Sequence, residues 1–239
     1  MRVAVIIPTK NEEAVLEANI RRLAAFLAGL SPAYACSIII ADNGSTDGTA
    51  ALAERLSREL PGVGWFHLDQ PGRGRALKKA WLETDADVVG YMDADLSTEL
   101  EALPRALAAI AAGSDIAVGS RLLPASRTGR SLRREAVSRT YNTIVRWLLH
   151  SPIVDSQCGF KFLRREAARE LVPLIENDKW FFDTELLFLA RERGKKVAEL
   201  PVAWAENRKS TVKVVPTAIE EFRGVLRLRR QAAERRRRK

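Results

Sequence analysis

The chain has 239 residues, of which 46% are hydrophobic and 29% are charged, and its formal net charge is +9. This composition excludes a wholly disordered chain, a collagen-like chain and a coiled coil, and the length allows one α/β domain with a sizeable core. Residues 223–239 hold nine Lys or Arg residues and one acidic residue, which leaves thirty basic and twenty-nine acidic residues elsewhere. The sequence therefore predicts a nearly neutral body followed by a basic tail.

The amino-terminal sequence runs from Met1-Arg2 directly into the strand-like segment 3–8, so we expect no cleaved signal sequence. The longest uncharged stretch, 24–41, is interrupted at 29–32 by Gly-Leu-Ser-Pro, so we expect a helix end, a turn and a strand there and no membrane span. The two cysteines lack the spacing of a metal site or a disulfide framework, which fits a reducing compartment. These features predict a cytoplasmic protein.

Short apolar segments alternate with helical patterns in the first half of the chain. Strands are predicted at 3–8, 37–41, 63–68, 87–93 and 115–119, and helices near 12–29, 47–60, 73–84 and 99–112. Strands that are apolar on both faces indicate a buried parallel sheet, and the alternation of strand and helix indicates an open sheet with helices on both sides. The predicted fold class is therefore α/β, with a mostly parallel sheet flanked by helices.

The pattern changes after residue 119, where a polar stretch rich in Arg and Ser begins. The elements predicted beyond it are a helix at 135–150, a strand near 158–163, helices near 165–176 and 182–193, a strand near 197–204, a polar loop at 205–213 and a last helix from about 215. The sequence contains no repeat and no linker-like stretch. We predict one domain over residues 1–222, with a distinct carboxyl-terminal subregion, followed by the basic tail 223–239.

Three polar clusters follow predicted strands, at 8–12 (PTKNE), 42–49 (DNGSTDGT) and 93–95 (DAD). Ligands of open α/β sheets bind outside the carboxyl ends of the strands. Asp93 and Asp95 are two residues apart, so the period of a strand directs both carboxylates to one side. Such hard oxygen ligands suit Mg²⁺ or Mn²⁺ shared with substrate phosphates, although a solvated turn is the alternative interpretation.

Two segments also have a structural interpretation. Asn43-Gly44 favours a turn, and Ser45 or Thr46 can cap the next helix, which is compatible with a nucleotide contact at Asp42. The segment 72–75 (GRGR) indicates first a helix entry and second a loop close to a ligand, because the rest of a dinucleotide fingerprint is missing.

Six motifs occur in a specific order, namely PTKNE, DNGSTDGT, DAD, GSR (119–121), DSQCGFK (155–161) and WFFDTELL (180–187). With these motifs the chain resembles the family 2 inverting glycosyltransferases of the GT-A fold, over roughly residues 3–230. It is most similar to the polyprenyl-phosphate sugar transferases, and among them to dolichyl-phosphate glucosyltransferase. The last two motifs carry the similarity to this subgroup.

The resemblance implies a nucleotide-sugar half at about 1–120 and an acceptor half at about 121–222. The residues that would bind the nucleotide sugar are Pro8, Lys10, Glu12, Ile40, Asp42, Asp93 and Ala94, with Arg208 and Lys213 from a later loop whose spacing departs from that of relatives. Asp95 would be the principal ligand of Mg²⁺ or Mn²⁺, assisted by Asp93. Ser97, where relatives of the mannose subgroup often have Gln, would complete the set.

The resemblance also assigns the catalytic and acceptor groups. Asp95, Arg121 and Asp155 would be catalytic, with Asp155 as a metal ligand or an acceptor-side carboxylate. The acceptor phosphate would be held by Arg121, Arg133 and Arg134, for which a solvated basic loop is the alternative. The residues expected to be structural are Asp183 and Glu185, which would orient Gln157 or Lys161, and the aromatic residues 180–182, which would pack in the core.

The chemistry of a phosphate acceptor fits these groups. Breaking the anomeric C–O bond expels a nucleoside diphosphate, whose growing charge a divalent ion, Arg and Lys can neutralise. A phosphate monoester is already a dianion at neutral pH, because its second pKa is about 6, so it requires no strong general base.

The predicted function is transfer of glucose or mannose from a donor such as UDP-glucose or GDP-mannose to polyprenyl phosphate. A glycosyltransferase with a soluble acceptor is an alternative. Nucleic-acid binding through the arginine tail is disfavoured, because the neutral body offers no base readout, and we expect no specific nucleic-acid partner.

A polyprenyl acceptor would bring the protein peripherally to the inner face of the membrane. Helical spacing groups apolar residues beside arginines in 135–149 (Val137, Tyr141, Ile144, Leu148, Leu149) and in 215–226 (Val215, Ile219, Phe222, Leu226). Such basic amphipathic helices suit an anionic bilayer surface, although both stripes could instead pack on the core. The basic tail would bind the same surface or a membrane-protein partner.

Overall fold

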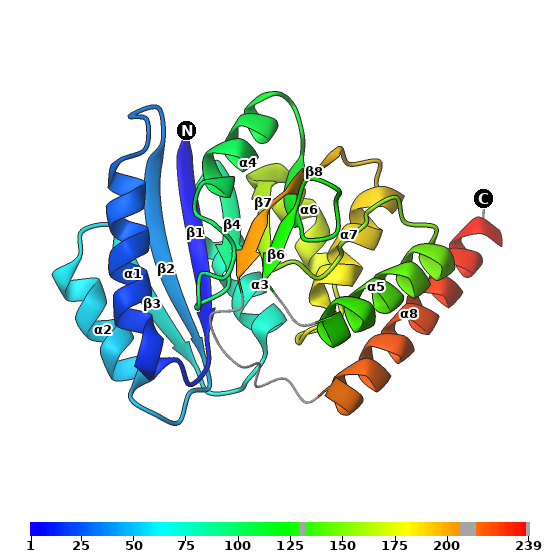
Figure 1. Ribbon diagram of the computed structural model, residues 1–239, viewed down its shortest axis with the longest axis horizontal. Coiled ribbons are helices and arrows are strands. Elements are labelled where there is room, and N and C mark those ends of the chain that lie inside the picture. The colour runs from blue at the N-terminus through cyan, green and yellow to red at the C-terminus, as the bar shows by residue number, and fades with distance from the viewer. Residues whose placement is uncertain (130–131, 206–213, 238–239) are drawn as a thin grey trace.

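The computed structural model describes residues 1–129, 132–205 and 214–237. Its centre is a sheet of seven strands: β1 (Arg2–Thr9), β2 (Ala35–Asn43), β3 (Val63–Leu68), β4 (Val88–Met92), β5 (Ile116–Ser120), β7 (Phe160–Arg164) and β8 (Val197–Pro201) (Figure 1). The strand order is β3-β2-β1-β4-β7-β5-β8. The strands pair in parallel except for β7, which is antiparallel to β4 and to β5. The predicted α/β class with an open, mostly parallel sheet is confirmed.

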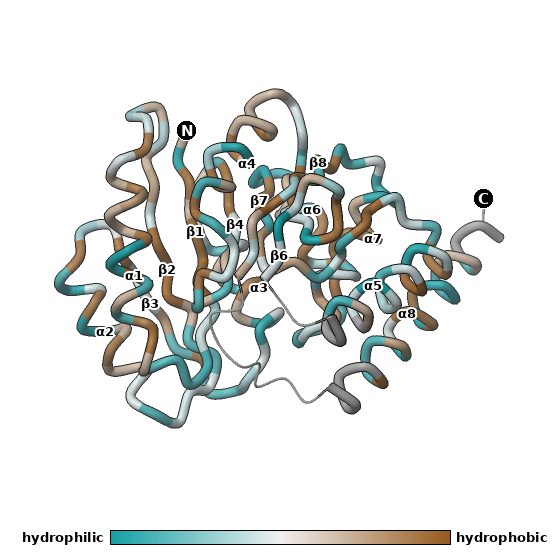
Figure 2. Tube along the Cα trace, in the orientation of Figure 1, coloured by the Kyte–Doolittle hydropathy of each residue, from teal (hydrophilic) through white to brown (hydrophobic). Residues whose placement is uncertain are grey.

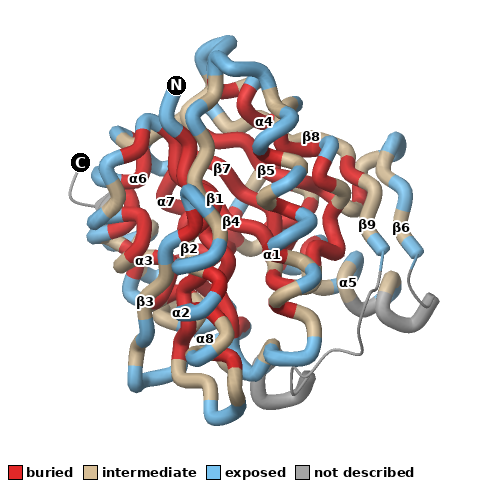
Figure 3. The backbone as a smooth tube through the Cα atoms, turned by 90° about the vertical axis from the view of Figure 1, so that its left-hand side faces the viewer, coloured by how far each residue is buried: buried red, intermediate tan, exposed pale blue. Residues whose placement is uncertain are grey.

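Helices cover both faces of the sheet (Figure 1). One face packs against α1 (Glu13–Ala28), α2 (Thr49–Glu59) and α4 (Ala102–Ala111). The other packs against α3 (Arg73–Glu83), α5 (Leu132–Leu149), α6 (Arg165–Leu171), α7 (Phe182–Glu192) and α8 (Val214–Arg237), and a short 3₁₀ turn, Val172–Leu174, follows α6. Two apolar cores result, one on each side of the sheet, and the buried strands between them form the centre of Figure 3.

The alternation of side chains along β1 explains the two cores. Val3, Val5 and Ile7 belong to the core beneath α1 and α2, whereas Ala4 and Ile6 belong to the core beneath α3. Both sets are fully buried, because successive side chains of a strand point to opposite faces. The strands are accordingly hydrophobic over most of their length in Figure 2.

The second half of the chain departs from its predicted elements in three places. The predicted polar stretch contains β6 (Arg127–Gly129), which pairs in parallel with β9 (Ala203–Ala205) as a separate ribbon. The strand expected near 197–204 is therefore two strands, β8 and β9, separated by buried Val202. The helix expected near 165–176 ends at residue 171, and Pro173 follows in the 3₁₀ turn.

The boundary predicted at residue 222 falls inside α8. The helix continues to Arg237, and Val225 and Leu228 on its inner side are buried in the core. The backbone of Gly224 packs so closely on the ring of Phe181 that a Cβ atom at residue 224 would clash with that ring. The basic segment is thus in large part a docked helix.

Replacing Trp81 by Ala should lower the free energy of unfolding. The indole is fully buried, and its ring centroid lies 5.6 Å from that of Phe182 and 6.2 Å from that of Tyr91. Removing such a side chain costs about 3–5 kcal/mol in transfer energy and cavity formation. Urea unfolding monitored by circular dichroism measures the change. The neighbouring exposed residue provides the control, since Leu82→Ala should cost less than about 1 kcal/mol; equal losses would contradict the packing described here.

Candidate active site

The loops that follow β1 and β2 are tied together at the carboxyl edge of the sheet. The Asn11 N–H donates to Ser45 Oγ over 2.9 Å, and the Thr46 N–H donates to Asn11 Oδ1 over 2.8 Å. The Glu12 N–H donates to Thr49 Oγ1 over 2.8 Å. Asn11 adopts a φ of 56°, in the left-handed region that Asn tolerates better than most residues. Polar segments that are 35 residues apart in sequence therefore form one rigid edge.

Asp42 is fully buried at the end of β2, and both of its carboxylate oxygens are engaged. Ser45 donates its hydroxyl to Oδ1, and His67 Nδ1 lies 2.6 Å from Oδ2. The neighbouring Asn43 donates to the carbonyl oxygen of Thr9 over 2.6 Å and accepts the N–H of Gly72 over 3.2 Å. These contacts fix the carboxylate beside the loop that begins α3.

The structure divides the residues expected to contact the nucleotide into accessible and buried ones. Lys10 is exposed and Glu12 is partly exposed, whereas Pro8 and Ile40 are buried. The alternation of β2 directs Ile40 into the core beneath α1 and α2, away from any bound base. The expected contact between Ile40 and a nucleobase is therefore not supported, while Lys10 and Glu12 are accessible to a ligand.

Asp93, Ala94 and Asp95 form a tight turn directly after β4. The Leu96 N–H donates to the Asp93 carbonyl oxygen over 2.9 Å, and Leu96 adopts a φ of 47°. The Ser97 N–H donates to Asp95 Oδ1 over 3.0 Å. The carbonyl oxygen of buried Ala94 accepts the side-chain amide of Asn19 over 2.8 Å. Hydrogen bonds from α1 and from within the turn thus hold the two carboxylates in place.

Asp93 lies at the meeting point of the two halves of the chain. Its side chain is 39% exposed, and its Oδ1 lies 3.8 Å from Arg73 Nη1. The surrounding protein, together with the nearby carboxylate of Asp95, raises the pKa of Asp93 to about 6, although Arg73 acts in the opposite direction. A Cβ atom at Gly159, in the QCGFK motif, would overlap the Asp93 carboxylate. The motif requires glycine there because the acceptor half approaches Asp93 so closely.

A buried cluster of charges lies behind Asp93. The Asp183 carboxylate accepts the Tyr91 hydroxyl over 2.7 Å, lies 3.1 Å from Lys161 Nζ and pairs with Arg73. Burial alone would raise the pKa of Asp183, but the two cations hold it below its ordinary value. The Arg73 guanidinium also lies 4.6 Å from the ring centre of Trp180. Asp183 therefore orients Lys161, as the sequence predicted, and Arg73 as well.

Arg121 and Asp155 form a buried, bidentate ion pair. Arg121 Nε lies 2.7 Å from Asp155 Oδ2, Arg121 Nη2 lies 2.9 Å from Oδ1, and the Arg121 N–H donates to Oδ2 over 3.0 Å. Burial would raise the pKa of Asp155, but Arg121 lowers it below its ordinary value. Because Arg121 engages both oxygens, the geometry favours a role for Asp155 in orienting Arg121 rather than in binding a metal.

The turn after β4 fits a divalent cation. Asp93 and Asp95 supply two hard carboxylate ligands, and the Oγ atom of buried Ser97 has no hydrogen-bond partner among the described residues. Within the described residues, no group of three or more His, Cys, Asp or Glu side chains could hold a metal. This arrangement suits Mg²⁺ or Mn²⁺, which binds through one or two carboxylates and completes its coordination with substrate phosphates and water.

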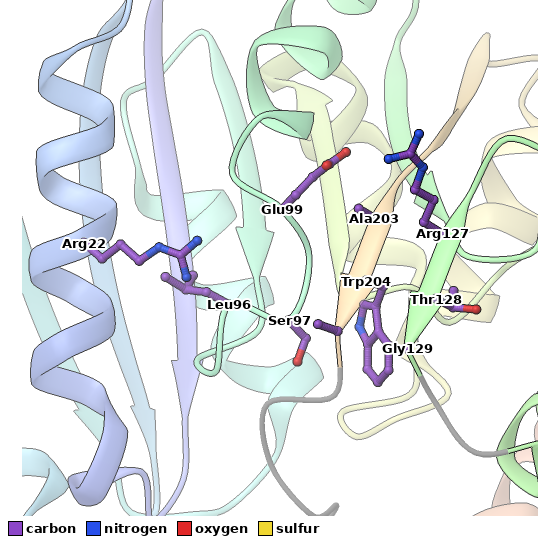
Figure 4. A pocket seen from close by; sticks show the side chains of 10 residues that line it. Arg22, Leu96, Ser97, Glu99, Arg127, Thr128, Gly129, Ala203 and Trp204 are labelled. Carbon is purple, nitrogen blue, oxygen red and sulfur yellow. The ribbon is translucent and has the colours of Figure 1, made fainter.

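A cavity of about 500 Å³ opens beside this turn, between α1 and the β6–β9 ribbon (Figure 4). Its wall combines the cations Arg22 and Arg127 with the apolar side chains of Leu96 and Trp204, and Ser97 forms part of its lining. The guanidinium of Arg121 lies 5.8 Å from the ring centre of Trp204. The cavity therefore offers positive charge and apolar surface next to the candidate metal site.

Four of the predicted site residues cannot be evaluated. Arg208 and Lys213 lie outside the described residues. For Arg133 and Arg134 the structure describes the backbone of α5 and not the side chains.

Three polar side chains that sequence reasoning missed hold the loop that precedes β7. Asn142 of α5 binds Ser156, Glu221 of α8 binds the Gln157 side chain, and Glu199 of β8 accepts the N–H of Asp155. Burial raises the pKa of Glu221 to about 7. The sequence signal for Glu221 was an acidic pair, Glu220-Glu221, between the apolar positions Ile219 and Phe222 of a helix, which by itself indicates no partner.

The outer faces of α5 and α8 carry exposed apolar side chains. The exposed residues are Ile144 and Trp147 on α5 and Ile219, Phe222 and Leu226 on α8, and Trp147 reaches 74% exposure. Of the other predicted apolar positions, Tyr141, Leu148 and Leu149 pack inward, and the side chains of Val137 and Val215 are outside the described residues. The two helices lie side by side at the end of the molecule opposite α2 (Figure 1). In the described ranges, no helix combines the length and the apolar character of a membrane span.

Curated proteins with similar sequences are glycosyltransferases. Glycosyltransferase AglD of Haloferax volcanii is 36% identical over 90% of this chain and 35% of its own length. Dolichyl-phosphate beta-glucosyltransferase ALG5C of Trichomonas vaginalis is 32% identical over 87% of this chain and 65% of its own. Polyprenol monophosphomannose synthase of Mycolicibacterium smegmatis is 33% identical over 92% of this chain and 83% of its own length. The chain thus spans about a third of AglD and slightly less than two thirds of ALG5C.

Solved structures share the fold. Glucosyl-3-phosphoglycerate synthase from Mycobacterium tuberculosis, crystallised with Mn²⁺ and UDP-glucose, matches with a TM-score of 0.69 at 20% identity, over 95% of this chain and 78% of that one. S. aureus TarS matches with a TM-score of 0.64 at 19% identity, over 96% of this chain and 64% of that one. Residues 4–172 match the sequence profile of Glycosyl transferase family 2. The chain belongs to glycosyl transferase family 2 and has a GT-A-like fold.

Proposed function

We propose that this enzyme transfers a hexose, glucose or mannose, from a UDP- or GDP-sugar to a polyprenyl phosphate with inversion at the anomeric carbon. The observation that carries the proposal is the turn of Asp93 and Asp95, where the Asp93 carboxylate lies 3.8 Å from Arg73 and within the electrostatic influence of Arg121. The names of the dolichyl-phosphate glucosyltransferase and polyprenol monophosphomannose synthase relatives support a lipid phosphate as the acceptor.

The donor half would bind the nucleoside diphosphate at the carboxyl edge of the sheet. Lys10 and Glu12 would contact the nucleoside, with buried Asp42 holding Ser45 and His67 in place beside it, and Asp93, Asp95 and Ser97 would hold Mg²⁺ or Mn²⁺ against the diphosphate. When bound, the divalent ion would offset the charge that builds on the departing diphosphate. Arg73 and Arg121 would add fixed positive charge, which costs little reorganisation because carboxylates already orient both side chains.

The transfer itself would be a single displacement. An oxygen of the acceptor phosphate forms a bond to the anomeric carbon, and the bond from that carbon to the diphosphate oxygen breaks as the diphosphate leaves with the electron pair. The acceptor is already a dianion near neutral pH, so no strong base has to remove a proton. In this scheme Asp155 acts by orienting Arg121, because Arg121 occupies both of its oxygens.

Two surface features support an amphiphilic acceptor. The cavity beside Ser97 offers Arg22 and Arg127 to an anion and Trp204 to an apolar group. The apolar outer faces of α5 and α8 lie among exposed arginines, among them Arg223 and Arg229, which suits an anionic bilayer. We therefore propose that the enzyme binds peripherally to the membrane that carries its acceptor.

The donor should be identified by thermal stabilisation. A nucleotide sugar that binds only the folded enzyme raises the free energy of unfolding by about 2.7 kcal/mol at a hundredfold excess over its dissociation constant. A thermal-shift panel of UDP- and GDP-hexoses with Mn²⁺ should therefore show an increase in Tm for one base. If no member of the panel raises the Tm, the proposal of a nucleotide-sugar donor is wrong.

Replacing Asp95 by Ala should lower turnover by roughly 10²–10³-fold, as the loss of one group that stabilises the departing charge does in other enzymes. Transfer of radiolabelled hexose to polyprenyl phosphate measures the effect, and Mn²⁺-dependent binding of the nucleoside diphosphate should weaken in parallel. Glu83→Ala, at an exposed carboxylate at the end of α3, serves as the control and should leave both unchanged. Wild-type turnover in the Asp95→Ala variant would remove the metal assignment.

Binding to anionic vesicles should depend on the arginines of α8. Each basic side chain near an anionic surface contributes about 1 kcal/mol, so the double variant Arg223→Gln, Arg229→Gln should bind roughly 30-fold more weakly at low salt. Co-sedimentation with phosphatidylglycerol vesicles measures the affinity. The matched control removes two arginines of α2, Arg55 and Arg58, at the opposite end of the molecule (Figure 1). Equal binding by both double variants and the wild type would contradict the proposed docking face.

A further inference from the structure

The loop that precedes β7 is bound by both helices that carry the exposed apolar faces. On the α5 side, Asn142 Oδ1 accepts the N–H of Ser156 over 2.9 Å and its hydroxyl over 3.0 Å. Asn142 is buried, and its amide donates to the Ser138 carbonyl oxygen over 3.0 Å, which fixes its orientation. Ile144 and Trp147 lie on the outer side of the same helix.

Glu221 makes the corresponding contact from α8. It is buried although it lies between the exposed residues Ile219 and Phe222, and its carboxylate accepts the side-chain amide of Gln157. The inward direction of Glu221 follows from helical spacing, since Val225 and Leu228 are four and seven residues further along and are also buried. Each helix thus presents apolar side chains outward and one polar side chain inward, to adjacent residues of one loop.

Asp155, the residue of this loop that precedes Ser156, holds Arg121. Asp155 accepts three hydrogen bonds from Arg121, and the Gln157 N–H donates to Asp155 Oδ1 over 3.2 Å. Glu199 accepts the N–H groups of Val154 and Asp155 and so holds the other side of the loop. Hydrogen bonds and the short covalent chain 155–157 therefore connect the inner sides of α5 and α8 to the guanidinium of Arg121.

Where α8 attaches to the body, polar contacts accompany the apolar packing of Val225 and Leu228. Arg227 pairs with Glu176 and, over 2.7 Å, with buried Glu185, and the Asn177 amide donates to Glu220 over 3.2 Å. Polar contacts tolerate small displacements of a helix better than an interdigitated apolar interface, because a close-packed core resists any change in its spacing. A surface that binds the outer faces of α5 and α8 can therefore shift the inner contacts of Asn142 and Glu221.

We propose that Asn142 and Glu221 are positioning residues that couple the seating of α5 and α8 on an anionic bilayer to the orientation of Arg121, so that the membrane-bound enzyme turns over faster. This inference rests on the proposed function, because it takes the bilayer as the occupant of the outer faces. The occupant is argued from charge complementarity, since exposed arginines surround the apolar residues. A bilayer can shift α5 and α8 only if it binds one arrangement of the two helices more tightly than the arrangement in the free enzyme. The exposed apolar side chains on both helices provide that preference.

The coupling is measured as the stimulation of turnover by vesicles with a short-chain, water-soluble polyprenyl phosphate as the acceptor. The kcat of the full chain is determined without vesicles, with phosphatidylcholine vesicles and with vesicles that contain phosphatidylglycerol. Anionic vesicles should raise the kcat of the wild type at least about fivefold, the lower end of ordinary coupling between two sites. Asn142→Ala and Glu221→Ala should retain the affinity for anionic vesicles but lose the stimulation, measured as the ratio of kcat with anionic vesicles to kcat without vesicles.

Three controls separate positioning from general damage. Glu221→Gln keeps an oxygen that accepts from Gln157 and should restore the stimulation. Asn19→Ala removes the hydrogen bond that the Asn19 side chain of α1 donates to the Ala94 carbonyl oxygen. This variant should have a lower kcat without vesicles, but the same ratio of kcat with anionic vesicles to kcat without them. Hydrogen exchange of the wild type supplies a readout that requires no variant: anionic vesicles should slow exchange in residues 155–158.

Stimulation of the Asn142→Ala and Glu221→Ala variants equal to that of the wild type would overturn the inference, as would unchanged exchange in residues 155–158 on vesicle binding. These outcomes differ from failure of the proposed function. In that case the wild type would transfer no hexose under any condition, and the exchange experiment would still test the coupling.

Discussion

The ion pair between Arg121 and Asp155 sets the geometry on which the site depends. It joins the end of β5 to the loop before β7, and β7 then brings Gly159 against the carboxylate of Asp93. Leaving one partner of such a buried pair uncompensated costs about 3–5 kcal/mol, so the pair holds the loop in one arrangement. The separation between the turn after β4 and the loop before β7 is therefore fixed by one guanidinium and by a glycine that has no side chain to displace.

Buried charges are concentrated on the side of the sheet covered by α3, α5, α7 and α8. Asp183 is satisfied by Arg73, Tyr91 and Lys161, and Glu185 by Arg227 and by the N–H groups of Glu176 and Asn177. The core beneath α1, α2 and α4 is instead made of aliphatic and aromatic side chains. The two faces thus differ in purpose: one provides a stable platform for the strands, and the other uses paired charges to orient the groups next to Asp93.

The sequence predicted the strands of the donor half well, because each is a short apolar run followed by polar residues at the edge where ligands bind. It also predicted that Asp93 and Asp95 lie at the end of the fourth strand, although the two residues follow β4 in a turn instead of continuing the strand. The burial of Ile40 could not be predicted, because it depends on which face of β2 meets α1 and α2. The roles of Arg73, Asn142 and Glu221 could not be predicted, since each acts through a partner that lies 14 to 110 residues away in the sequence.

The direction of the late strands was equally beyond local patterns. The segment 158–163 was expected to be a strand, but its direction and its place between β4 and β5 follow from the loop that Asp155 anchors. The basic tail illustrates the same limit. Its charge is plain in the sequence, whereas Val225 and Leu228, the apolar side chains that dock this helix on the core, lie among arginines and give a weak apolar pattern.

The strand order has a consequence for how the chain is made. During synthesis β1 to β4 emerge first and can pair as β3-β2-β1-β4, but the free edge of β4 is completed by β7, and not by β5, which emerges earlier. Until residues 160–164 leave the ribosome, the nascent sheet therefore presents the unpaired edge of a fully buried strand. Unpaired apolar edges invite association with other chains. About seventy residues therefore have to be synthesised, at roughly 5–20 residues per second, between the end of β4 and the end of β7. During that interval the nascent chain depends on chaperones or on rapid synthesis to avoid association with other chains.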